Sequence, residues 1–150
     1  MLQRKQSVYL LVAAILSAVC MFLPIGSFVS ENMGADAVMY NIAIKSMNGS
    51  MDYSVCVLFI LLMVNVLSTV INIFLFKNRK LQSTLCKANM VVILLWYVGY
   101  AYFGFNGIQG AEFSFSASAI MPFIALLGEF LANRGIRADE ELIRSMDRIR

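Results

Sequence analysis

The stretch from Tyr53 to Phe76 reads YSVCVLFILLMVNVLSTVINIFLF and contains no charged residue. Crossing a hydrocarbon core about 30 Å thick takes roughly 20 helical residues, and a helix satisfies its own backbone polar groups where water is absent. The stretch therefore predicts a transmembrane helix. Further apolar runs predict three more spans, at 8–29, 88–105 and 113–132. The expected fold class is an all-α membrane protein with four transmembrane helices in a single domain, 1–150.

Composition and charge placement agree with this prediction. The chain is 60% hydrophobic and 14% charged, whereas soluble domains average about 25% charged residues. Every basic residue except Lys45 lies before the first run, between the second and third, or after the fourth. Short loops rich in Lys and Arg stay in the cytoplasm. We therefore expect a multi-pass protein of a cell inner membrane with both termini cytoplasmic, the lipid bilayer as a partner and no nucleic-acid partner.

The first run has an alternative interpretation. Arg4 and Lys5 could be the positive region of a cleaved signal peptide, with 8–23 as its apolar core. The length of the run and the lack of a clean small-x-small cleavage site favour a retained first helix.

The polar segment between the first two runs, 30–52, carries a strand pattern. An alternation with a period of two runs through Val38, Tyr40, Ile42 and Ile44. Asn48-Gly49 follows as a turn signal, and 28–31 could pair with the predicted strand. We expect a small outer β-hairpin between helices 1 and 2.

Polar residues follow one face of the second predicted helix. They stand at i, i+3, i+4 and i+7, the positions of Asn65, Ser68, Thr69 and Asn72. Uncharged polar side chains of this kind commonly hydrogen-bond neighbouring transmembrane helices, so a structural role is favoured. The alternative is a polar pathway or ligand-facing surface.

Glu129 is the only acidic residue within a predicted span. A carboxylate in a membrane is costly and is a functional candidate by default, for ligand binding or proton coupling. Its place near the cytoplasmic end favours an interfacial role instead, paired with Arg134, Lys77 or Arg79. In the same helix Pro122 predicts a kink. Small residues predict close contact with the second helix, at Ala125, Gly128 and Ala132.

The closing segment, 133–150, predicts an amphipathic cytoplasmic helix. Asp139 is placed to cap it, and apolar residues recur at a helical spacing behind the cap. Together with the basic loop after the second run, this segment supplies the candidates for cytoplasmic interaction, which are Arg79, Lys80, Arg134, Arg137, Arg144 and Arg148. A protein partner or homo-oligomer through this face is expected.

The chain lacks the residue patterns on which metal binding, disulfide exchange and nucleophilic catalysis usually depend. The chain has no histidine and only three cysteines, without a Cys-x-x-Cys spacing. Cys20 and Cys56 could meet in a disulfide, although small buried thiols are the simpler interpretation. No nucleophile–base pair stands out. We therefore predict a protein that is not an enzyme and has no catalytic residue, metal site or cofactor.

Three segments resemble a known family: MLQRKQSVYL at 1–10, FKNRKLQ at 76–82 and NRGIRADEELIRSMDRIR at 133–150. These are similar to a small four-pass family of Gram-negative bacteria known as domain of unknown function 4293. The resemblance implies an inner-membrane protein with four helices and brings no activity or ligand. It spans nearly the whole chain.

Two functions follow as hypotheses. The favoured one is a non-enzymatic membrane scaffold or accessory subunit that uses its cytoplasmic face. The alternative is a small oligomeric transporter or channel for a small molecule or ion, with the polar stripe and Glu129 along its path.

Overall fold

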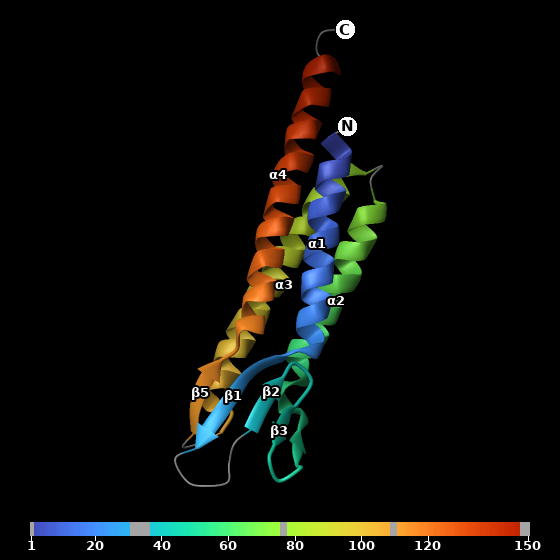
Figure 1. The fold of residues 1–150 in the computed structure, drawn as a ribbon. Helices are drawn as coiled ribbons and strands as arrows, with labels where there is room; N and C mark the ends of the chain where they lie inside the picture. The colour runs from blue at the N-terminus through green and yellow to red at the C-terminus, as the bar shows by residue number, and fades with distance from the viewer. Residues whose placement is uncertain (1, 31–36, 76–77, 109–110, 148–150) are drawn as a thin grey trace.

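The computed structural model describes residues 2–30, 37–75, 78–108 and 111–147. Four long α-helices lie side by side as an elongated bundle, with both ends of the chain at one end and the strands at the other (Figure 1). The helices are α1 (Leu2–Phe22), α2 (Cys56–Phe74), α3 (Arg79–Asn106) and α4 (Met121–Asp147). Short 3-10 helices precede two of them, η1 (Tyr53–Val55) and η2 (Ala117–Ile120).

The strands form one antiparallel sheet of five, in the order β4-β3-β2-β1-β5. Their bounds are β1 (Pro24–Ser30), β2 (Ala37–Tyr40), β3 (Ile44–Ser46), β4 (Met51–Asp52) and β5 (Ala111–Phe115). The predicted hairpin exists as β1 and β2, with Phe28 opposite Ala37. The sheet is larger than predicted. The segment 38–44 folds back at Asn41 into two strands, and the segment between α3 and α4 adds β5.

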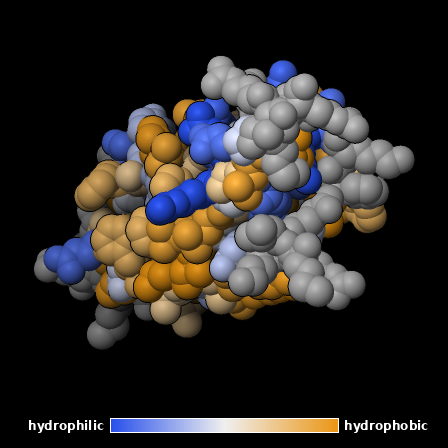
Figure 2. Space-filling model, turned by 90° about the horizontal axis from the view of Figure 1, so that it is seen from above, coloured by the Kyte–Doolittle hydropathy of each residue, from blue (hydrophilic) through white to orange (hydrophobic). Residues whose placement is uncertain are grey.

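Within the described residues, three helices are long and apolar enough to cross a membrane: the segments Tyr53–Phe74, Arg79–Asn106 and Ala117–Ile143. The apolar part of α1, Gln6–Phe22, is shorter. At 1.5 Å per residue, the whole of α1 is about 32 Å long, which is close to the thickness of a bilayer core. Seen from the end that carries the termini, hydrophobic side chains occupy much of the visible face, beside hydrophilic ones (Figure 2).

The first helix ends and the fourth begins at other residues than predicted, because strands and a 3-10 helix form there. The first helix ends at Phe22, since Pro24 begins β1, and the predicted fourth span loses 113–120 to β5 and η2. Pro122 then lies in the first turn of α4, where its missing N–H is not needed, so the predicted kink was wrong.

The predicted separate tail helix was also wrong, because α4 continues unbroken to Asp147. Asp139 therefore lies inside the helix and caps nothing. Its Oδ2 instead accepts a hydrogen bond of 2.7 Å from Gln6 Nε2, which ties α4 to α1.

Each helix packs mainly against two neighbours, and α1 and α3 each contact both α2 and α4. The small residues of α4 pack against α1, which corrects the prediction that they would pack against α2. A Cβ at Gly128 would meet Tyr9 O at 3.2 Å and Ala13 Cβ at 3.5 Å. Close approach of the two backbones is therefore built into α4 where it packs on α1.

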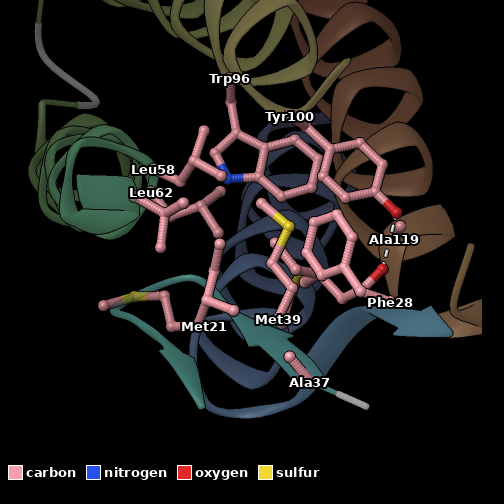
Figure 3. Close-up of a cluster of buried hydrophobic side chains, with 13 residues drawn as sticks. Met21, Phe28, Ala37, Met39, Leu58, Leu62, Trp96, Tyr100 and Ala119 are labelled. Carbon is pink, nitrogen blue, oxygen red and sulfur yellow. Dashed lines mark hydrogen bonds between the residues drawn. The ribbon is translucent and has the colours of Figure 1, made fainter. Parts of the chain in front are cut away.

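The largest apolar core lies where the sheet meets the bundle (Figure 3). Trp96 from α3 and Phe28 from β1 are fully buried there, with Met39 of β2 beside them. The indole Nε1 donates to Asn41 Oδ1 at 2.9 Å, and Asn41 Nδ2 donates to Cys20 O at 2.7 Å. The sheet is thereby fastened to α1 and α3, so it forms part of the same folded unit as the helices.

Candidate functional site

A buried polar cluster lies at the centre of the bundle, around Glu129 of α4. The Glu129 side chain is fully buried, and its Oε1 accepts hydrogen bonds from Thr69 Oγ1 at 2.9 Å and Asn65 Nδ2 at 3.3 Å. Asn89 of α3 donates to Thr69 Oγ1 at 3.0 Å. Three helices thus contribute to one hydrogen-bonded group, which we call the Glu129 cluster: Asn65, Thr69, Asn89 and Glu129.

Two oxygen atoms of the Glu129 cluster are left over. Neither Glu129 Oε2 nor Asn65 Oδ1 has a hydrogen-bond partner among the described residues. Buried acceptors are costly to leave unpaired, at roughly 1–3 kcal/mol each. The carboxyl group is therefore able to take up a proton, which would turn Glu129 Oε2 from an acceptor into a hydrogen-bond donor.

Packed side chains close the Glu129 cluster on both sides. Toward the sheet lies a layer of Ala13, Ile93 and Ala125. Toward the termini lies a second layer, which consists of Leu10, Cys86, Ala132 and Ile136. Because both layers are buried, the cluster is separated from each end of the bundle by packed side chains.

The four residues of the predicted polar stripe on α2 do not all lie in the same site. Asn65 and Thr69 join Glu129, as their shared face suggested. Asn72 is buried one turn away, where its Nδ2 contacts Cys86 Sγ at 3.1 Å. Ser68 is only half-buried and lies outside the cluster.

Glu129 is fully buried, and its hydrogen-bond partners among the described residues are Asn65 and Thr69, which corrects the predicted interfacial role. Arg134 is exposed and Arg79 is half-buried, whereas the Glu129 carboxyl group is enclosed by α2 and α3. Lys77 lies outside the described residues. Asn89 was missed at the sequence level, although an amide inside an otherwise apolar run was the available signal.

The basic residues gather at the end of the bundle that carries the termini. Lys80, Arg134 and Arg137 are exposed, whereas Arg148 and the side chain of Arg144 lie outside the described part. Beside α4 is a hollow of about 340 Å³, lined by Phe130, Asn133, Arg134, Arg137, Ala138 and Glu141. Beyond it α4 runs past the start of α1 (Figure 1).

The three cysteines are free thiols, with Cys20 and Cys86 buried and Cys56 half-buried. Cys20 Sγ lies 3.6 Å from Ser118 O. Within 2–30, 37–75, 78–108 and 111–147, no group of three or more potential ligands could hold a metal ion. The chemistry that the described site offers is hydrogen bonding and protonation.

In the described residues the fold is a helical bundle, three of whose helices are long and apolar enough to cross a membrane, with a five-stranded sheet at one end. The model of the family described as Domain of unknown function (DUF4293) matches residues 2–149. The chain belongs to this family, which confirms the resemblance seen in its opening and closing segments. No curated protein matches the chain.

Proposed function

We propose that this is an integral protein of a bacterial inner membrane that crosses four times and keeps both termini in the cytoplasm. Support comes from the lengths of the four helices and from the charges at their ends. Lys80, Arg134 and Arg137 lie at the end with the termini, and Lys45 lies in β3 at the other end. Basic residues retained in the cytoplasm orient the bundle in this way. A reporter enzyme active only in the periplasm should be silent at residue 150 and active when inserted after Lys45; the reverse pattern refutes this topology.

Within that membrane, we propose that the protein acts as a non-enzymatic scaffold or accessory subunit. The observation that carries the proposal is the projecting end of α4. Leu142 and Ile143 are 57% and 42% exposed, and the exposed Glu141 directly precedes them in α4. Apolar residues flanked by charge, on a helix that extends beyond its bundle, are suited to pack against a helix of a partner protein.

The closed interior of the bundle also favours this role over a conduit. The Glu129 cluster is enclosed between two layers of packed side chains, and the layer toward the termini also contacts the buried amide of Asn72. A path through the bundle would require both layers to separate. The projecting end of α4 needs no such rearrangement to contact another protein.

Site-specific photocrosslinking tests the scaffold proposal. A benzophenone amino acid at position 142, in the full chain expressed in cells, should give one discrete protein adduct. The control carries the same group at Val98, which is 67% exposed on the flank of α3. Reversing the charges of Arg134 and Arg137 to Glu should weaken the adduct. No protein adduct at position 142, in membranes that contain normal amounts of the protein, refutes the proposal.

The second candidate is a small oligomeric transporter or channel, favoured by the unpartnered Glu129 Oε2. A membrane carboxyl group with no basic partner is a plausible proton carrier. Glu129→Gln should then abolish proton-coupled flux in liposomes. Glu112→Gln is the matched control, because Glu112 is exposed on β5. Equal flux in the two variants removes Glu129 from any transport mechanism.

A further inference from the structure

An apolar groove lies beside the sheet end of the bundle, between α3 and α4. It has a volume of about 680 Å³, which is within the usual range of roughly 300–1,000 Å³ for ligand sites. One wall is α3, with Tyr97, Tyr100, Ala101 and Phe105. The rest is formed by Phe115 of β5, by η2 and by Phe123 of α4. Aromatic rings therefore line the groove from three sides.

The polar atoms of this groove already have partners within the fold. The Tyr97 hydroxyl donates to Ala119 O at 2.7 Å, and the Tyr100 hydroxyl donates to Ile25 O at 2.6 Å. The backbone N–H of Ser116 also bonds to Ile25 O, at 3.2 Å. No charged residue is among the residues that line the groove. A polar ligand would lose its hydrogen bonds to water here without gaining equivalent ones.

The groove opens on the flank of the bundle. Ala101, Phe105, Ile120 and Phe123 at its rim are exposed. Along α3 the rim continues into the exposed apolar surface at Val98, which faces lipid if the bundle is placed as proposed. The groove is therefore continuous with the surface that contacts the bilayer, and its opening is reached from lipid.

We propose that this groove binds the hydrocarbon chain of a membrane lipid, which enters sideways from the bilayer. The inference rests on the proposed membrane location. An apolar chain needs no hydrogen bonds, fits a hollow lined by apolar and aromatic side chains, and is present at high concentration beside the opening. The aromatic walls supply a large contact area that would otherwise be left incompletely packed.

The single tryptophan of the chain provides a reporter for this site. Trp96 is fully buried, so bulk lipid does not touch it. Its ring is stacked on Tyr100, with ring centroids 5.1 Å apart and an interplanar angle of 11° (Figure 3). Because Tyr100 lines the groove, a bromine atom on a bound acyl chain would come close to Trp96 and quench its fluorescence.

The experiment reconstitutes the full chain in vesicles of phosphatidylcholine with or without brominated acyl chains. Ala101→Phe fills the groove, and Val98→Phe adds the same ring to the lipid-facing flank of the same helix outside it. Quenching of Trp96 should be equal in the unmodified protein and in Val98→Phe. It should fall by at least half in Ala101→Phe. Equal quenching in the two variants overturns the inference.

Further measurements separate the ways in which the inference can fail. Flotation of the vesicles on a density gradient tests membrane insertion, so a protein that does not float contradicts the proposed location. Ala117→Phe fills the groove from η2 and replaces Ala101→Phe if that variant does not fold. A second copy seated in the groove would make quenching increase as the protein is diluted in lipid, and that result also overturns the inference. Native mass spectrometry should show a retained lipid that Ala101→Phe releases.

Discussion

Asn41 holds the sheet to the bundle, and its removal should weaken the whole fold. The residue is fully buried at the turn between β2 and β3. Its amide accepts from Trp96 Nε1 and donates to Cys20 O, at 2.9 and 2.7 Å. Replacing Asn41 with Ala leaves both of these groups buried without their partner.

The magnitude follows from those two bonds. An unpaired buried polar group costs about 1–3 kcal/mol, so two of them would cost roughly 2–6 kcal/mol. The space left by the amide is polar and can admit a water molecule, which would restore part of the bonding. We therefore expect Asn41→Ala to lower the free energy of unfolding by about 2–4 kcal/mol.

Unfolding in mixed micelles by added sodium dodecyl sulfate measures this loss, with far-UV circular dichroism as the readout. The matched control is Ile42→Ala at the next position, where the side chain is 47% exposed. In a Trp96→Phe background the effect of Asn41→Ala should shrink by about 1 kcal/mol, since one of its bonds is already absent. If Asn41→Ala and Ile42→Ala shift the midpoint equally, the proposed role of Asn41 is wrong.

Other predictions concern packing in the bundle and sheet. Thr69→Val removes the hydroxyl between Asn89 and Glu129 and should lower the free energy of unfolding by about 0.6–1.7 kcal/mol. Thr69→Ser keeps a hydroxyl and should lower it less. Equal losses of stability in the same unfolding assay would show that the hydroxyl does not stabilise the bundle. A Cβ at Gly26 would meet Phe113 Cζ, so Gly26→Ala should lower the free energy of unfolding by about 1–3 kcal/mol. Adding Phe113→Leu should restore part of that stability. If it does not, the clash with Phe113 is not the cause of the loss. In intact vesicles a membrane-permeant maleimide should label Cys56 faster than the buried Cys86, and equal labelling rates measured by mass shift would contradict the described packing.

The chain's pattern predicted the number and order of the long helices, because hydrophobicity along a helix is a local property, but it did not predict where α1 and α4 begin and end. The run from Tyr53 to Phe76 corresponds to η1 and α2, with the helix ending at Phe74. The shared face of Asn65 and Thr69 was predicted from helical spacing alone, and both side chains do meet Glu129. The sequence also indicated a turn at Asn48-Gly49, where Gly49 has a φ of 81°.

Long-range pairing could not be predicted in the same way. The five residues of β5 alternate between apolar and polar, which is a strand pattern. That pattern does not specify the partner strand, which is β1, with Gly26 opposite Phe115. Nothing near Asn41 in the sequence indicates that its amide reaches Trp96 in α3. Such contacts depend on the arrangement of distant segments, and residue type alone does not specify that arrangement.

By itself, the amino-acid sequence determined the number of long apolar segments and the clustering of positive charge around three of the connections and ends. These properties depend on the free energy of transferring each residue from water to hydrocarbon, and that free energy is nearly independent of the neighbouring residues. Only the tertiary structure decided that Glu129 is enclosed by amides and a hydroxyl, and that α4 continues past the bundle. Burial and hydrogen bonding of a side chain are set by whichever distant residues pack against it, so they exist only once the helices have assembled.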